Sequence, residues 1–268
     1  MAGSRPAGQK SQLWRNVRIL LLLLVLFAVA LRTWLDRIET QGWQSTLWVG
    51  IYPCNGDGTE RTQHYVDGLH VEDFADIEEF FSREGQRYGL KVEQPVHIEL
   101  YPQGATLPPL LEPGSGPVGI AWWSLKLRWF AARHSDVPGR APPRIRMFVL
   151  YHDPATLQTA PDSHGLQKGL VGIVHAFADR TMNGPNNIVI AHEFLHTVGA
   201  SDKYDFASGA PLFPSGYGDR DQRPLFPQQH AEIMAARRAL SPQEWQMPRS
   251  LGSVVVGPET ALEVRWKR

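Results

Sequence analysis

Residues 192–196 read His-Glu-Phe-Leu-His and constrain this chain more than any other part of the sequence. Two histidines four residues apart lie on one face of a helix, so both imidazoles can reach one metal ion. The glutamate beside the first histidine is placed to hold a water molecule that the metal acidifies. The pattern therefore predicts a helix over residues 187–198 that carries a zinc site, with His192 as a ligand and Glu193 as the general base.

The residues that follow extend this predicted site. Gly199 lets the chain leave the helix in a sharp turn. Six residues after His196, Asp202 can turn back as a third ligand, and three protein ligands with one open position are typical of catalytic zinc. Asp205 and Glu232 are alternative third ligands.

Length and composition restrict the classes of protein that the chain can belong to. Its 268 residues suffice for one large domain or two lobes, and 43% of them are hydrophobic. The formal net charge is zero, so the chain lacks the excess positive charge that is typical of nucleic-acid-binding proteins. The single cysteine, Cys54, excludes an internal disulfide and thiolate zinc sites, and we expect it to be a buried structural thiol.

The N-terminus predicts export or membrane anchoring. The first 18 residues carry four basic and no acidic side chains, and residues 19–31 form an unbroken apolar run. We expect a basic cytoplasmic tail over 1–16, a single signal anchor in the inner membrane over 17–35 and a periplasmic catalytic domain over 44–268. The alternative is a cleaved signal peptide, because Ala28-Val29-Ala30 fits a cleavage site. Both interpretations place the domain outside the cytoplasm.

Elsewhere the sequence predicts an α/β lobe with the motif helix as its floor. An amphipathic helix is expected over residues 74–88, with Gly89 as its stop. Residues 118–130 fit either a helix or a strand, and their aromatic side chains are expected in the core. Bulky or alternating residues predict strands at 46–52, 96–101, 145–151 and 169–178.

Two further elements are expected near the C-terminus. Ser241, Pro242 and Glu244 form a capping-box pattern that predicts the start of a helix. Residues 253–266 predict a closing strand, or a hairpin around residues 257–258.

The motif His-Glu-x-x-His-x-x-Gly-x-x-Asp of residues 192–202 resembles that of the metzincin metallopeptidases, in the variant with aspartate as third ligand that snapalysin-like enzymes have. Ile233-Met234-Ala235 resembles the methionine turn beneath the metal of that family, with Met234 as a packing residue. The resemblance covers roughly residues 145–246. It implies a two-lobed domain with a mixed sheet, one Zn²⁺ and hydrolysis of peptide bonds. The whole chain also resembles an uncharacterised family of bacterial membrane-anchored proteins.

One position departs from that family. Some metzincins stabilise the oxyanion with a tyrosine two residues after the turn methionine, where this chain has Ala236. Tyr204 or Tyr217 could take that role. His230, four residues before Met234, could face the metal.

The expected cleft involves two more histidines and one strand. His152 and His175 follow or lie in predicted strands and could line the cleft, or support the core. The strand at 172–177 is expected to be the cleft edge, where a peptide or protein substrate adds as one more strand. We expect an endopeptidase. The alternatives are a non-catalytic zincin-fold binding module of the cell envelope and a hydrolase of the peptide stems of the cell wall.

Overall fold

The computed structural model describes residues 7–267 except 103–105, 136, 158, 160, 162 and 167–169. The chain divides into two compact units, residues 1–42 and residues 43–268. Residues 1–6 of the expected basic tail and residue 169, the expected start of a strand, lie outside the described residues.

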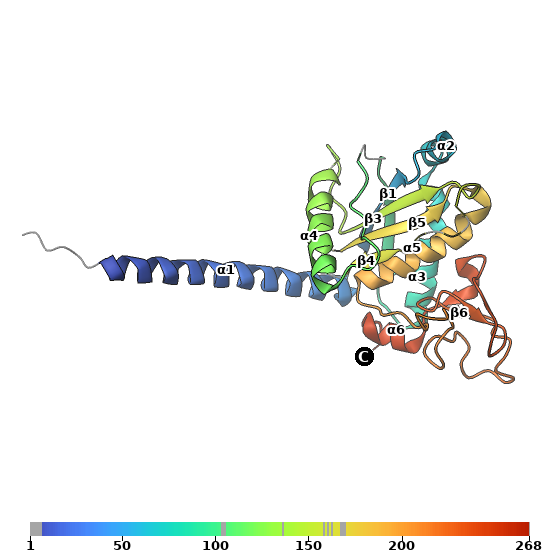
Figure 1. Ribbon diagram of the computed structural model, residues 1–268. Helices are drawn as coiled ribbons and strands as arrows, with labels where there is room; N and C mark the ends of the chain where they lie inside the picture. Colours follow the sequence, from blue (N-terminus) through green and yellow to red (C-terminus); the bar gives the residue numbers. More distant parts are fainter. Residues whose placement is uncertain are drawn as a thin grey trace, which may run out of the picture. The chain divides into compact units, whose positions relative to one another are not determined.

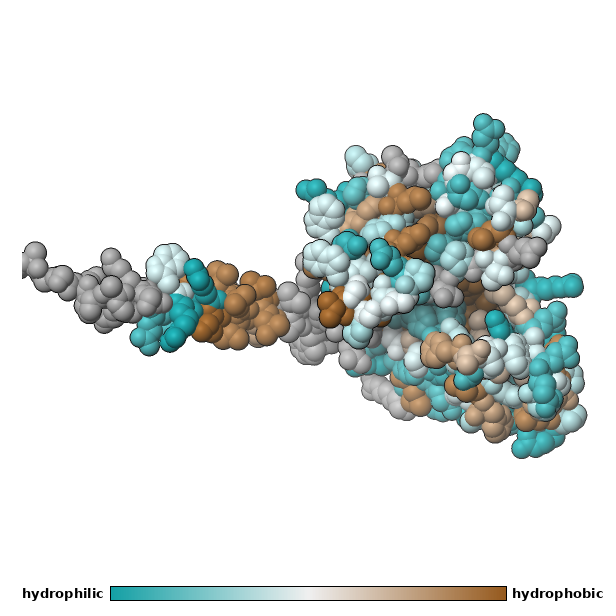
Figure 2. All heavy atoms as spheres, viewed as in Figure 1, coloured by the Kyte–Doolittle hydropathy of each residue, from teal (hydrophilic) through white to brown (hydrophobic). Residues whose placement is uncertain are grey.

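The first unit contains one helix, α1 (Ala7–Gly42). No glycine or proline interrupts the chain from residue 9 to residue 41, so nothing breaks the helix there. The side chains of residues 20–27 are exposed and form a hydrophobic stretch of α1 (Figure 2). Among the described residues, no helix combines the length and apolar character needed to cross a membrane. The anchor expected over residues 17–35 has no support from the structure.

The second unit is built on a mixed sheet (Figure 1), as the sequence predicted. The strand order is β2-β1-β3-β5-β4, in which β4 pairs with β5 in antiparallel orientation and the other neighbours are parallel. Nearly every residue of β1, β3 and β5 is buried, as expected for parallel strands that helices cover on both faces. The strands are β1 (Leu47–Asn55), β2 (Val96–Leu100), β3 (Ile145–His152), β4 (His164–Leu166) and β5 (Val171–Phe177).

Helices cover the two faces of this sheet. Alternate side chains of β3 point to opposite faces, so Met147 packs in the cluster with α3 and α5 while Phe148 packs in the cluster with α4. The helices are α2 (Glu60–Asp67), α3 (Ala75–Arg87), α4 (Pro117–His134), α5 (Asn183–Thr197) and α6 (Pro258–Glu263). Short 3₁₀ turns lie at Val71–Phe74, Arg180–Met182 and Leu251–Ser253.

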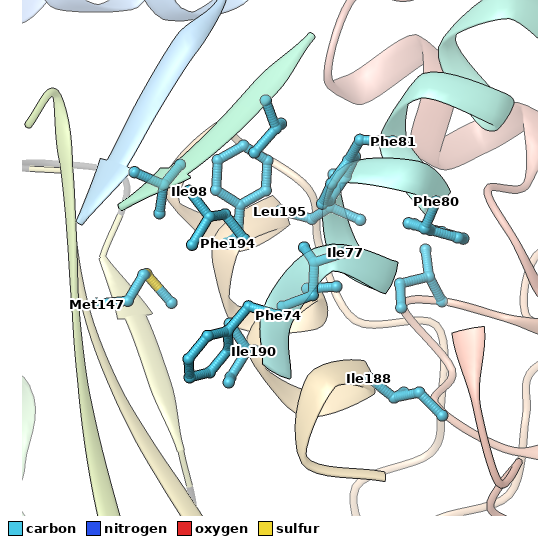
Figure 3. Packing of buried hydrophobic residues seen from close by; sticks show 14 of the residues in the cluster. Phe74, Ile77, Phe80, Phe81, Ile98, Met147, Ile188, Ile190, Phe194 and Leu195 are labelled. Atoms are coloured by element: carbon cyan, nitrogen blue, oxygen red, sulfur yellow. The ribbon is translucent and has the colours of Figure 1, made fainter. Parts of the chain in front are cut away.

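The larger core lies between the sheet and helices α3 and α5 (Figure 3). The rings of Phe81 on α3 and Phe194 on α5 meet edge to face, with centroids 4.8 Å apart. Leu195 and Ile190 of α5 are also fully buried in this cluster. This packing fixes α5, the helix that carries the histidine motif, against the sheet.

Residues 118–130, which fit helix or strand by sequence, lie in α4. The amphipathic helix expected over 74–88 is confirmed as α3, and Gly89 follows its end with φ of 75°. A residue without Cβ adopts this left-handed backbone conformation without strain, which explains why the helix stops there.

The prediction of a helix that begins at Ser241 is wrong. The chain forms a tight hairpin there between β7 (Arg238–Ala239) and β8 (Trp245–Gln246), and the backbone N–H of Leu240 donates to the carbonyl of Glu244 at 2.8 Å. Pro248 limits any helix beginning at Pro242 to less than two turns.

The prediction of a hairpin around residues 257–258 is also wrong. Strand β9 (Val254–Val255) pairs in parallel with β6 (Ala231–Glu232), and Gly257 then becomes the N-cap of α6 with Pro258 in its first turn. Proline suits the first helical position because its missing N–H would have no partner there.

Candidate metal centre

The motif helix α5 is held at both ends. At its start, the amide of Asn186 donates to the carbonyl of Phe177 at 2.9 Å and accepts from the N–H of Phe177 at 3.0 Å. At its end, Gly199 has φ of 108°, and the N–H of Ala200 donates to the carbonyl of Leu195 at 3.0 Å. The predicted turn at Gly199 is therefore confirmed, and it directs the chain back towards α5.

Three ligand atoms converge after this turn. Nε2 of His192, Nε2 of His196 and Oδ1 of Asp202 lie 3.1 Å from one another on all three sides of a triangle. Around an ion with ligands at about 2.0–2.1 Å in tetrahedral geometry, ligand atoms lie about 3.3 Å apart. The size of the triangle therefore fits a small metal ion.

The hydrogen bonds of both imidazoles turn their Nε2 atoms into this triangle. Nδ1 of His192 lies 3.0 Å from the carbonyl oxygen of Ile233, and Nδ1 of His196 lies 2.9 Å from that of Ala200. A carbonyl only accepts, so Nδ1 of each ring donates a proton to it, and Nε2 is the ring nitrogen that faces the triangle. Two imidazole nitrogens and a carboxylate oxygen thus face one another, an arrangement that a proton or a metal cation between them stabilises.

The charges of the group favour a positive species in the same place. Burial by itself lowers the pKa of His192, but the hydrogen bond with Asp202 and the charge of Glu193 outweigh it and raise the pKa to about 9. Burial alone raises the pKa of Asp202, whereas its hydrogen bonds with both histidines lower it below its usual range. The site therefore keeps an anionic carboxylate and attracts a proton or a metal cation.

Glu193 is buried at the edge of this group. Its ligand atom lies within 4.8 Å of those of His192 and His196, and its Oε1 lies 4.0 Å from Nε2 of His192. Its Oε2 is buried and has no hydrogen-bond partner among the described residues. Burial raises the pKa of Glu193. A carboxylate oxygen without a partner and with raised basicity suits proton transfer with a water molecule.

The turn that carries Met234 packs against α5. Met234 is fully buried, and its carbonyl accepts from the N–H of Lys203, next to Asp202, at 3.0 Å. The carboxylate of Glu232 organises the turn, because it accepts from the N–H groups of Met234, Ala235 and Gly257 and from the hydroxyl of Thr260. Glu232 is thereby fully engaged as a structural acceptor.

A salt bridge fixes the segment around Asp202. The buried Nζ of Lys203 donates to both oxygens of Glu263 on α6 at 2.8 Å, and Glu263 also accepts from the N–H and hydroxyl of Ser201. Asp205 instead accepts from the N–H and hydroxyl of Ser208. The geometry therefore brings Asp202, and neither Asp205 nor Glu232, to the two histidines.

This salt bridge makes stability depend on pH. Burial alone raises the pKa of Glu263, but hydrogen bonds from Lys203 and Ser201 outweigh it and lower the pKa below 4.5. A lowered pKa stabilises the folded state above the unfolded-state value, and this contribution is lost as the pH falls through the folded-state pKa. We expect Glu263→Gln to lower the free energy of unfolding at pH 7 by about 1–2 kcal/mol, since Glu263 is partly exposed.

Urea denaturation at pH 7 and at pH 4 or below checks this expectation. The difference between the wild type and Glu263→Gln should shrink at the lower pH, because the wild-type carboxylate is then increasingly protonated. Glu244→Gln is the matched control, since Glu244 is exposed and should change stability little at either pH. An undiminished difference at low pH would contradict the charged interaction with Lys203.

The edge of the sheet near the metal centre is β4. The sequence places the edge at residues 172–177. Strand β4 pairs with Val171–Ile173 of β5, so the expectation is wrong at residues 172 and 173, where β4 forms the edge instead. The three-residue strand β4 gives no periodic signal that sequence reasoning could detect. A Cβ on Gly165 of β4 would lie 2.3 Å from the carbonyl oxygen of Glu193, so glycine allows β4 to pass directly over α5.

Sequence reasoning also missed His164. This residue lies on β4, its ring is 5.7 Å from that of Trp123, and its charge lowers the pKa of Glu193. His164 therefore lies close enough to the base to influence it electrostatically. No pattern around residue 164 distinguishes it in the sequence.

The residues expected to stabilise the oxyanion or to contact the metal lie in different places. The ring of Tyr204 lies 6.5 Å from that of His192, beside the group. Tyr217 packs between the rings of Phe213 and Phe226.

The imidazole of His230 has another partner. Its Nδ1 pairs with Asp219 at 2.9 Å, so the expectation that His230 could face the metal gains no support.

The remaining candidates lie in the sheet. His152 and His175 are buried, and Nε2 of His152 lies 2.8 Å from Nδ1 of His175. Burial lowers the pKa of His152. Cys54 is buried in β1, where burial raises its pKa to about 12, which fits the expected structural thiol.

Comparison with known proteins adds no assignment. No protein-family model matches the chain, and no curated protein matches it. What the structure supports directly is a buried group, His192, Glu193 and His196, that can hold a metal ion.

Proposed function

We propose that residues 43–268 form a zinc-dependent peptidase with a metzincin-like catalytic domain. One observation carries the proposal: the Nε2 atoms of two imidazoles and a carboxylate oxygen form a 3.1 Å triangle, beside a buried carboxylate oxygen without a hydrogen-bond partner among the described residues. Nitrogen and oxygen donors in this number suit zinc, and three protein ligands leave a position open for water or substrate. His192, His196 and Asp202 are the proposed ligands.

The protein side chains divide the chemistry between them. Bound zinc lowers the pKa of a water molecule to about 7 and polarises the carbonyl of the substrate. Glu193 accepts the proton of the attacking water through Oε2 and passes it to the nitrogen of the leaving amine. Tyr204 is the proposed donor to the developing oxyanion, because its ring lies beside that of His192. The turn at Met234 orients His192, because the carbonyl of Ile233 accepts a hydrogen bond from Nδ1 of that ring.

The substrate strand is proposed to add at β4. An edge strand presents unpaired backbone groups to which an extended peptide can bind. β4 lies at the end of the sheet and contacts α5 at Gly165, next to Glu193 and His196. The scissile bond of a peptide paired with β4 would therefore come close to the base. We also propose that residues 17–35 anchor the chain in the membrane and that the domain lies outside the cytoplasm. Both statements stay predictions.

A non-catalytic metal-binding module of the cell envelope is the second candidate. The observation that favours it is Ala236, which stands where some metzincins place the oxyanion tyrosine and has φ of 54°. Such a module would keep the ligands and the fold but would not hydrolyse a peptide. Cleavage of the peptide stems of the cell wall would require the same metal chemistry on another substrate.

Metal analysis and peptide cleavage by the purified full chain test the proposal together. We expect one zinc per chain, cleavage of a mixed peptide library, loss of cleavage with a chelator, and recovery on adding zinc. Stoichiometric zinc with no cleavage of any protein, library or cell-wall peptide would favour the binding module. A protein without bound zinc at micromolar metal would contradict both candidates.

A further inference from the structure

Helix α4 has two apolar faces, and the domain packs against one of them. Trp123, Leu127 and Phe130 are buried in the cluster between α4 and the sheet. The aromatic residues of this segment were all expected in the core, and that expectation is wrong for two of the tryptophans. The exposed fractions on the second face are 83% for Val118, 61% for Trp122, 51% for Leu125 and 59% for Trp129.

The spacing of these four residues makes them one stripe. They lie four, three and four positions apart, which places them on one side of a helix with 3.6 residues per turn. Figure 2 shows hydrophobic and hydrophilic spheres interspersed over the region where Figure 1 draws α4. Soluble proteins rarely leave an exposed apolar stripe with two tryptophans in water without a partner.

Positive charge borders the stripe on both sides. At 100° per residue, Lys126 and Arg133 lie along one flank and Arg128 along the other. The guanidinium of Arg133 lies 4.8 Å from the ring centroid of Trp129, at the border of the stripe. Helix α4 contains no acidic residue. The surface therefore combines apolar side chains, interfacial aromatic rings and cations.

We propose that this α4 stripe docks on the surface of a bilayer that contains anionic phospholipids. Tryptophan and leucine enter the boundary between headgroups and acyl chains, and flanking lysine and arginine bind the anionic headgroups. A second copy of the chain fits poorly, because two such stripes face to face would oppose Lys126 and Arg133 with their own counterparts. The proposal is independent of zinc chemistry and of the anchor at residues 17–35.

Docking through α4 has a consequence for the metal centre. Helices α4 and α5 belong to clusters on opposite faces of the sheet. With α4 on the lipid, the face of the sheet that carries α5 is turned away from the membrane. The metal centre would then be presented to soluble proteins or peptides, while the domain stays in contact with lipid.

A fluorescent label on the stripe tests the proposal in the full chain. Leu125→Cys is labelled with an environment-sensitive nitrobenzoxadiazole group, and native Cys54 stays unlabelled because it is buried. With vesicles of phosphatidylcholine containing about 30% phosphatidylglycerol, we expect a blue shift and at least about a twofold rise in emission. The matched control is Gln86→Cys, an exposed site on α3 across the sheet, whose label should stay in a water-like environment.

Charge reversal separates the anionic surface from a general apolar attraction. Lys126→Glu with Arg133→Glu should raise the lipid concentration at half-maximal signal at least about tenfold, whereas Lys91→Glu with Arg249→Glu should change it little. Circular dichroism checks that each variant is folded. Water-like emission of the Leu125→Cys label on anionic vesicles would overturn the proposal. So would a signal that rises with protein concentration without vesicles, which would indicate pairing of two copies.

Discussion

Glu193→Gln is expected to lower kcat for peptide cleavage about 100- to 10,000-fold, while zinc stays bound at one ion per chain. Glutamine keeps the shape of the side chain but has no carboxylate that can accept a proton from water. Because Glu193 is buried and its Oε2 has no partner among the described residues, the substitution breaks no hydrogen bond of the folded state at that atom. Removing a buried, basic carboxylate should leave stability unchanged or slightly raised.

Three measurements on one preparation distinguish this chemical role from a structural one. They are the kcat and KM of cleavage, the zinc content and the midpoint of thermal unfolding. Glu244→Gln serves as the control, because it makes the same change at an exposed position. Cleavage by Glu193→Gln at close to the wild-type rate would exclude Glu193 as the base. Loss of zinc in this variant would instead make Glu193 a ligand.

Asp202→Ala is expected to weaken zinc binding by more than about 100-fold. Removing a residue that only supports a ligand typically costs 10- to 100-fold in metal affinity, so removing a ligand atom should cost more. The carboxylate oxygen of Asp202 lies 3.1 Å from both imidazole nitrogens, and its loss also removes the negative charge that favours a cation there. Asp205 is the matched control, because it lies three residues away and its carboxylate binds Ser208.

Competition with a chromophoric chelator measures the zinc affinity of both variants. Asp205→Ala should bind zinc within a few-fold of the wild type, and Asp202→Ala should release it to the chelator. The opposite ranking would show that the loop rearranges when metal binds and that Asp205 is the ligand. Differential unfolding with and without zinc provides a second readout, since a bound metal stabilises the folded state in proportion to its affinity.

The histidine motif was predictable because its geometry is local. Four residues of helix bring His192 and His196 to one face whatever the rest of the fold does, and Gly199 allows the turn that follows. The buried strands and the amphipathic helix α3 were predictable for the same reason, since burial imposes periodicity on neighbouring residues.

Hydrogen-bond partners that lie far apart in the sequence could not be predicted from local patterns. The carbonyl that orients His192 belongs to Ile233, 41 residues away, and the carboxylate that holds Lys203 belongs to Glu263, 60 residues away. Strand β4, which carries His164, is too short for any pattern to mark it. Helix α4 escaped assignment because apolar residues occupy both its packed and its exposed face.

Local sequence was enough to predict the chemistry that this chain can offer: two histidines and a glutamate on one helix, a turn after them and an aspartate within reach. It also determined that the histidines share a face, because helical geometry follows from neighbouring residues. The folded structure was needed to show that Asp202 completes the triangle, that Glu232 is an acceptor within its own turn and that β4 forms the edge. Those choices depend on contacts between distant segments, which form only when the buried core brings the segments together.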